Sequence, residues 1–134
     1  MSTRATYRIS TTSYWGVENQ CFYIHYDGYP RGAARYFKEF LSNLDHLIND
    51  GRYRKGKAVV AFGMLAFSEF TEAHENHGDT EYRYNIYHDQ QKGTFVVNSF
   101  KHSWGEDSQD IWSEFFKGPL EEFINKHDTL EGEE

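Results

Sequence analysis

The sequence predicts one α+β domain, in which a four-stranded, mainly antiparallel sheet is covered on one face by about three helices. The chain has 134 residues, the length of one ordinary domain, and no internal repeat or linker, so residues 1–134 are expected to fold as one unit. Strand-like and helix-like segments follow in the order β-β-α-α-β-β-α, a grouping that is typical of α+β domains. The 11 Phe, 10 Tyr and 3 Trp residues provide a large aromatic core and argue against disorder.

The first two strands are predicted near the N-terminus. Residues 3–10 place apolar side chains at every second position from Ala5 to Ile9, which is the period of a half-buried strand. Residues 20–26 are nearly all large, which suits a central strand covered on both faces. The polar residues 11–19 between these segments are expected to form a turn.

Two helices are predicted in the middle of the chain. Residues 33–49 carry apolar side chains at spacings of three and four, and the Asn-Asp-Gly sequence at 49–51 is a helix stop signal. Residues 57–74 are expected to form a second helix. The first half of that segment is apolar nearly all round, which predicts a position deep in the core, and Gly63 favours a close approach to another element.

A hairpin is predicted after these helices. Residues 81–88 and 94–100 have strand-like patterns, and the loop between them, residues 89–93, ends in glycine. This length and this closing residue are typical of a four- or five-residue hairpin loop.

The C-terminal region is expected to be helical. A helix is predicted from Asp107 or Ser108, either of which is a good N-cap. Its apolar stripe consists of Ile111, Trp112, Phe115 and Phe116. Gly118 and Pro119 should end this helix, and Pro119 can open a second short helix. The buried residues of that short helix are expected to be Leu120, Phe123 and Ile124. The acidic tail, residues 128–134, is expected to fray.

The composition argues against two classes of function. With 21 acidic and 14 basic residues, the net charge of −7 disfavours direct nucleic-acid binding, because phosphate contacts need a basic surface. The mean hydropathy of −0.81 and the absence of an apolar run near 18 residues argue against a membrane span. Residues 1–7 lack the apolar segment of a secretory signal, and a lone Cys21 cannot form an internal disulfide. A cytoplasmic protein with Cys21 as a small buried side chain is therefore expected.

A stretch rich in acidic residues and histidines, residues 69–81, is the first candidate for chemistry. Carboxylates and imidazoles are the usual ligands of divalent metals. The candidate metal ligands or acid/base groups are Glu72, His74, His77 and Asp79. Their spacing does not match a helical H-E-x-x-H zinc motif. The alternative is a solvated acidic helix end, where histidines are favoured near the helix C-terminus.

The turn that leads into the first predicted helix is the second candidate. Its candidate binding residues are His25, Asp27, Tyr29 and Arg31. Backbone N–H groups at the start of a helix can hold an anion, and glycine lets a ligand approach the backbone. The sequence contains neither a P-loop nor a dinucleotide motif at this place. The alternative is a structural turn in which Tyr29 packs on the sheet.

Several aromatic residues fall in predicted turns rather than on helical or strand stripes. They are Tyr14, Trp15, Tyr29, Tyr53 and Trp104. Tyrosine and tryptophan are enriched at the hot spots of protein interfaces. These residues are therefore candidates for binding a partner.

Three stretches of the chain resemble a group of known proteins. They are MSTRATY at residues 1–7, HYDGYP at residues 25–30 and HENHGDTEYRY at residues 74–84. Together they resemble small proteins carried by bacteriophages and mobile elements, and some short phage proteins of this size are anti-defence factors such as anti-CRISPRs. The resemblance implies a place in the cytoplasm of a bacterial host cell, and a host protein such as a CRISPR effector or another defence component as the partner.

Two hypotheses of function follow. The first is a non-enzymatic protein that binds and inhibits a host protein of a nucleic-acid-handling defence complex, without a cofactor; a homodimer would also cover surplus aromatic side chains. The second is a small-ligand- or divalent-metal-binding protein or enzyme, which uses the turn at residues 25–31 and the cluster at residues 69–79. We favour the first hypothesis, because the chain is small, acidic and rich in Tyr and Trp.

Overall fold

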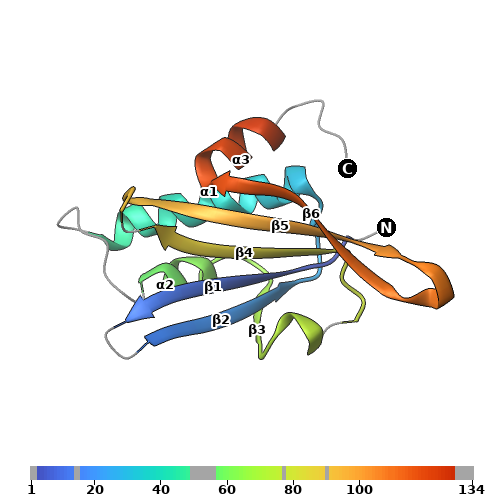
Figure 1. Ribbon diagram of the computed structural model, residues 1–134. Helices are drawn as coiled ribbons and strands as arrows, with labels where there is room; N and C mark the ends of the chain where they lie inside the picture. Colours follow the sequence, from blue (N-terminus) through green and yellow to red (C-terminus); the bar gives the residue numbers. More distant parts are fainter. Residues whose placement is uncertain (1–2, 14–15, 49–56, 77, 90, 129–134) are drawn as a thin grey trace.

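A computed structural model of the chain describes residues 3–13, 16–48, 57–76, 78–89 and 91–128 (Figure 1). Within these residues, six strands form one mixed sheet, and three α-helices pack on one of its faces, so the chain is an α+β protein. The strands are β1 Ala5–Ser13, β2 Gly16–Ile24, β3 Ser68–Thr71, β4 Tyr82–Asp89, β5 Thr94–Trp104 and β6 Asp110–Pro119. The helices are α1 Pro30–Leu47, α2 Lys57–Gly63 and α3 Leu120–His127, with short 3₁₀ turns at His74–Asn76 and Glu106–Ser108.

The strand order in the sheet is β3-β2-β1-β4-β5-β6. The central pair, β1 and β4, is parallel, with Tyr7 beside Tyr84, and the other neighbouring pairs are antiparallel. The N-terminal hairpin β1–β2 thus joins the C-terminal meander β4–β5–β6 in the middle of the sheet.

The core is centred on two tyrosines of the parallel pair. Tyr7 and Tyr84 are fully buried, and their rings stack with centres 5.0 Å apart. Each helix adds one phenylalanine to this pair. Phe37 of α1 and Phe62 of α2 lie 6.1 and 5.1 Å from the Tyr7 ring. Phe123 of α3 lies 5.9 Å from the Tyr84 ring, so one aromatic cluster holds all three helices on the same face of the sheet.

The N-terminal hairpin is longer than the sequence pattern predicts. Residues 11–19 were expected to form a turn, yet β1 continues to Ser13 and β2 begins at Gly16. Thr11 pairs with Glu18 and Thr12 with Val17, so the strands extend through this polar segment. The prediction was wrong because threonine favours strands even where polarity suggests a loop.

The second helix is much shorter than predicted. It ends at Gly63 instead of continuing to His74, and Ser68–Thr71 form the edge strand β3. Turns at residues 64–67 follow the helix, Phe67 has a positive φ of 67° directly before β3, and Phe70 packs on Phe22 of β2 with ring centres 5.0 Å apart. A continuous apolar run cannot by itself distinguish a helix from a strand.

The predicted helix after residue 107 is instead the strand β6. The register of β5 and β6 shifts between Ser99 and Phe100, whose partners are Phe116 and Glu114. Phe115 is thus the extra residue of a bulge, and both it and Phe116 contact the helix side of the sheet. The bulge reproduces a helical spacing, which explains the error. With β3 and β6 added, the sheet has six strands in the described residues instead of four, and it is mixed.

Other predicted elements are confirmed with shifted ends. The predicted helix at residues 33–49 is α1, and the predicted hairpin strands are β4 and β5. Pro119 directly precedes α3, in which Leu120 and Phe123 are buried and Ile124 is partly buried. Of the predicted tail only Asp128 is described, and its carboxylate lies 2.8 Å from Lys38 Nζ. No helix in the described ranges is long and apolar enough to cross a membrane.

Candidate functional site

The structure brings the three motif stretches of the sequence together at one end of the sheet. The Gly28 N–H donates to the Thr3 carbonyl at 2.8 Å, and the Glu81 N–H donates to the Arg4 carbonyl at 2.9 Å. The Tyr84 hydroxyl donates to the Gly28 carbonyl at 2.7 Å. Segments that are far apart in the chain are therefore joined to one another there.

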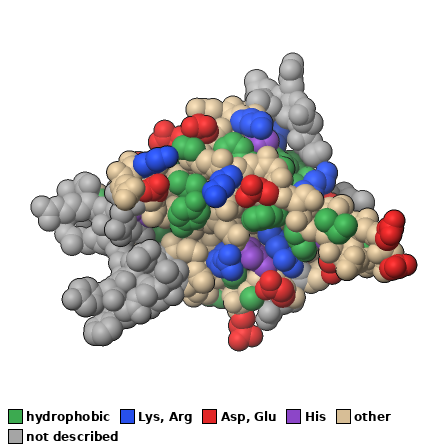
Figure 2. All heavy atoms as spheres, viewed as in Figure 1, with side chains coloured by type: hydrophobic (Ala, Val, Ile, Leu, Met, Phe, Trp, Pro, Cys, Tyr) green, Lys and Arg blue, Asp and Glu red, His purple; other side chains and the backbone are tan. Residues whose placement is uncertain are grey.

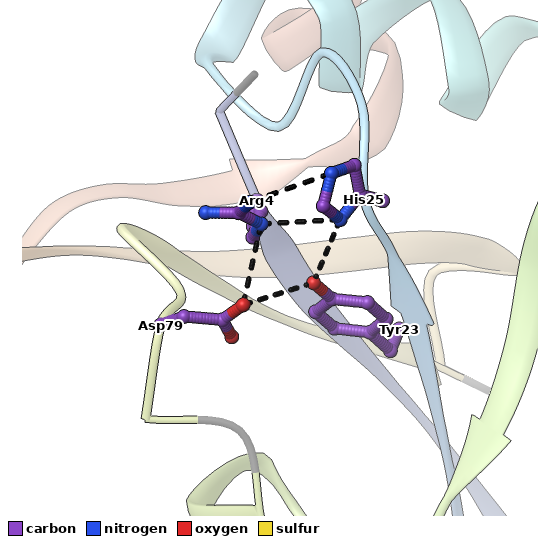
Figure 3. Close-up of polar contacts among 4 residues, drawn as sticks. All are labelled: Arg4, Tyr23, His25 and Asp79. Carbon is purple, nitrogen blue, oxygen red and sulfur yellow. Dashed lines mark hydrogen bonds and ion pairs between the residues drawn. The ribbon is translucent and has the colours of Figure 1, made fainter. Parts of the chain in front are cut away.

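Four side chains from these segments form a hydrogen-bonded group, which we call the polar quartet: Arg4, Tyr23, His25 and Asp79 (Figure 3). Arg4 Nε lies 3.2 Å from Asp79 Oδ2 and 3.1 Å from His25 Nδ1. The Tyr23 hydroxyl lies 3.2 Å from each of the same two atoms. Strands β1 and β2 position the first two residues, and the segment before β4 supplies Asp79. His25 and Asp79, from separate candidate stretches, thus meet in one group.

The protonation of Tyr23 defines the direction of its hydrogen bond. Burial of the ring raises the pKa of Tyr23, and the nearby Asp79 carboxylate raises it further. The phenol therefore stays protonated at neutral pH and donates to Asp79. The Arg4 and Asp79 side chains are 34% and 49% exposed, so the charged part of the quartet faces solvent. A guanidinium, a carboxylate and a half-buried imidazole are thus available to an approaching partner, while the phenol of the buried Tyr23 holds them in place.

His74 is held inside the structure rather than at the surface. It is buried, with Nδ1 2.6 Å from Thr6 Oγ1 and Nε2 2.7 Å from Asn85 Oδ1. Burial lowers the pKa of His74 to about 4, and the positive charges of Arg8 and Arg83 lower it as well. The ring is therefore neutral at pH 7, and both of its nitrogens face protein partners.

The structure separates the residues predicted to bind a metal. His74 faces the sheet and Asp79 belongs to the polar quartet, while Glu72 is exposed before the 3₁₀ turn. His77 lies outside the described residues. Among the residues that the structure describes, no three His, Cys, Asp or Glu side chains are grouped so that they could hold a metal ion.

The predicted binding turn lines a small cavity at the start of α1. Its volume is about 150 Å³, and Asp27, Tyr29 and Arg35 lie in its wall together with Glu39. The Tyr29 hydroxyl donates to Asp27 Oδ1 at 3.2 Å. The Ala33 N–H, one of the backbone N–H groups at the start of the helix, donates to the Tyr29 carbonyl at 2.9 Å and is not free for an anion. The carboxylates of Asp27 and Glu39 in the wall would repel an anion. Of the four candidate residues of this turn, only His25 belongs to the polar quartet (Figure 3).

A cluster of exposed apolar side chains lies beside β3, and the sequence reasoning missed it. We call it the edge patch, and its residues are Tyr26, Val60, Met64, Phe67 and Phe70. Their side chains are between 45% and 69% exposed. The sequence pattern predicted that residues 57–67 lie deep in the core, but only one side of this segment does, with Ala58, Ala61, Phe62 and Leu65 buried.

The edge patch contacts the polar quartet through Tyr26. The rings of His25 and Tyr26 lie 4.9 Å apart, and those of Tyr26 and Phe67 lie 5.4 Å apart. Phe67 has a φ of 67°, a left-handed conformation that is strained for a bulky residue. A strained and 69% exposed phenylalanine contributes little to this fold, and strain of this kind is concentrated at functional sites.

The other predicted aromatic binding residues are not part of this surface. Trp104 is 68% exposed at the end of β5, in the β5–β6 hairpin that projects from the sheet (Figure 1). Its ring lies 4.6 Å from His102. Tyr14, Trp15 and Tyr53 lie outside the described residues.

Comparison of the chain with protein families, with curated proteins and with solved structures found no match. The resemblance to phage proteins therefore stays a prediction, and the geometry of the surface carries the argument about function.

Proposed function

We propose that this protein acts by binding another protein through the surface formed by the edge patch and the polar quartet. The observation that carries the proposal is five exposed, large apolar side chains on α2, on β3 and in the segments next to α2 and β2, with the rings of Tyr26 and Phe67 in contact. Contiguous exposed apolar residues with a polar border are typical of protein-binding sites. The border here is the polar quartet, joined to the patch through His25 and Tyr26.

The residue types favour a protein partner. Phe67, Phe70 and Met64 offer apolar anchors. Tyrosine and arginine are enriched at interface hot spots, and the surface offers one of each in Tyr26 and Arg4. Positive, negative and histidine side chains are interspersed on the face drawn in Figure 2. This mixture does not favour a phosphate backbone, which would require a basic surface.

The position of the patch favours a partner that presents an extended segment. Strand β3 is the last strand in the sheet order, so one side of its backbone pairs with no strand among the described residues. Such an edge can accept a further strand, and neighbouring side chains then determine specificity. Phe70 on β3 and Phe67 just before it would contact the side chains of that segment.

The kind of partner is inferred from the resemblance to phage proteins. We propose a bacterial host protein, a component of a nucleic-acid-handling defence complex such as a CRISPR effector. In bacteria with an active CRISPR system, expression of the chain should raise the plating efficiency of a targeted phage. An unchanged plating efficiency across the CRISPR types tested would contradict the proposal that the partner is a CRISPR effector. The proposal of a binding surface is tested separately by the next experiment.

The binding surface is tested with two variants that replace equally exposed aromatic residues inside and outside the edge patch. The immobilised chain is exposed to a bacterial lysate, and retained proteins are compared between the wild type, the Met64→Ser/Phe67→Ser double variant and Trp104→Ser. Trp104 and Phe67 are equally exposed, at 68% and 69%, but only Phe67 belongs to the edge patch. We expect one retained protein to be lost with the double variant and kept with Trp104→Ser. Loss with Trp104→Ser alone, or no difference among the three, would overturn the proposal.

A further inference from the structure

A cavity of about 420 Å³ is lined by residues of α1, α3 and the beginning of β5. Figure 1 shows these elements in the half of the sheet away from β3. Its apolar lining consists of Leu41, Leu44, Ile48, Phe95 and Leu120. Leu44, Phe95 and Leu120 are at most 7% exposed, so they form a floor that belongs to the core. This volume is in the range of cavities that take small organic ligands.

The charged side chains that line the cavity, among the described residues, are both acidic. Asp45 and Glu121 line it and are exposed, and none of the described lining residues is a lysine or arginine. His88 also lines it, and burial lowers the pKa of His88, so this ring adds little positive charge at pH 7. Leu44 and Asp45 are in the last turn of α1, where the helix dipole favours a positive charge, whereas Leu120 and Glu121 begin α3, where it favours a negative one. The charge preference of the site therefore depends on the two carboxylates.

From the cavity, its apolar floor and its two carboxylates, we propose that this site binds a small organic cation, an ammonium group on an apolar body. The leucine and phenylalanine side chains would cover the apolar body, and the carboxylates would lie near the ammonium group. An anion of the same shape would meet two negative charges and no cationic lining residue. This site is independent of the proposed protein-binding surface, because the two share no residue.

The probe is 2-phenylethylammonium, and its counterpart is 3-phenylpropanoate, which has a similar body and the opposite charge. Both are titrated into the ¹⁵N-labelled chain at pH 7 and followed by NMR. We expect the ammonium compound to shift the amide resonances of Leu44, Phe95 and Leu120, with a dissociation constant at least about tenfold lower than that of the carboxylate. Equal affinities, or no shifts at these residues at millimolar concentration, would refute the proposal.

Two variants separate the cavity from nonspecific attraction to an acidic protein. Leu41→Trp fills the cavity and should weaken binding of the ammonium compound at least about tenfold. The Asp45→Asn/Glu121→Gln variant changes only exposed side chains, and we expect the preference for the ammonium compound to fall below about threefold. Glu122→Gln, one residue from the cavity lining, is the matched control and should keep the preference. If Glu122→Gln reduces the preference as strongly as the double variant, the cavity is not the site.

Discussion

The side chains of Thr6 and His74 are 68 positions apart in the chain and hydrogen-bonded at 2.6 Å. Thr6 belongs to the central strand β1, and His74 begins the 3₁₀ turn that connects β3 with β4. Because Asn85 contacts the other ring nitrogen, one imidazole ties this connection to two central strands. The connection also leads to Asp79, so the bond helps to position the polar quartet.

This arrangement predicts a loss of stability in mild acid. The pKa of His74 is about 4 in the folded protein, against an ordinary value of 6.5, so the unfolded chain takes up the proton first as the pH falls. The contribution of His74 to the free energy of unfolding is therefore complete above pH 6.5 and is lost between pH 6.5 and 4. Its size is on the order of 3 kcal/mol.

Urea denaturation at pH 7.5 and pH 5 measures this effect. His74→Gln should be less stable at pH 7.5 and should lose less stability on acidification than the wild type. His46→Gln leaves His74 in place and is the control. An equal loss on acidification in His74→Gln and the wild type would show that another group is responsible.

Replacing Phe67 with glycine should stabilise the fold while removing a partner contact. Glycine adopts the positive φ of this position without a steric penalty, and little buried area is lost because Phe67 is 69% exposed. We expect the free energy of unfolding in urea to rise by up to about 1 kcal/mol. Phe70→Gly is the control, since Phe70 is equally exposed but has no positive φ and packs on Phe22; it should destabilise. A decrease in both variants would argue against strain at Phe67.

Two glycine-to-alanine changes should have opposite effects. A Cβ at Gly32 would overlap the carbonyl oxygen of Asp27 and lie 2.7 Å from its Cβ, so Gly32→Ala should cost about 1–3 kcal/mol. A Cβ at Gly63, in α2, would make an ordinary contact of 3.6 Å with Phe22, and Gly63→Ala should stabilise by about 0.5–1 kcal/mol. Melting temperatures of the two variants provide the comparison. A stable Gly32→Ala protein would mean that the turn before α1 moves more easily than its packing indicates.

The Arg83 guanidinium lies 3.9 Å from the centre of the Trp112 ring, on the face of the sheet opposite the helices. A double-mutant cycle with Arg83→Gln and Trp112→Leu should give a coupling energy of about 0.5–2 kcal/mol. Lys101 and Tyr82 form a wider pair at 5.9 Å and are the comparison, for which we expect a smaller coupling. Equal coupling energies for the two pairs would show that the close contact of Arg83 with Trp112 adds no specific stabilisation.

The sequence predicted correctly those helices and strands in which the spacing of apolar residues matches the side that is buried in the fold. Helix α1 has a regular apolar face, and β4 and β5 alternate on the core side, so their existence and type were predictable. Strand β6 was mistaken for a helix because a bulge places Phe115 and Phe116 together on the helix side. Such a bulge depends on pairing with β5, and a local pattern contains no information about that pairing.

The candidate site was predictable only in part. His25 and Asp79 were chosen from two separate stretches, and no spacing in the sequence indicates that the two residues share a tyrosine and an arginine. The edge patch was missed because Val60, Met64 and Phe67 are apolar and fall in an apolar run, which predicts burial. Gly63 was interpreted as a glycine that allows close packing within a longer helix, although α2 ends there, and this hid the turn that exposes them. Whether an apolar residue is exposed to solvent depends on the tertiary fold, so the sequence pattern alone could not identify this patch.

The parallel pairing of β1 and β4 has a consequence for folding kinetics. Ala5 pairs with Tyr82, so the middle of the sheet closes only after most of the chain is available. Closing so long a loop has an entropic cost before any contact compensates for it, and proteins dominated by such distant contacts fold slowly. During synthesis, the N-terminal hairpin would therefore wait with an unpaired β1 edge until β4 has left the ribosome. Substitutions at Tyr7 and Tyr84, which meet across this parallel pair, should therefore slow folding as well as lower stability.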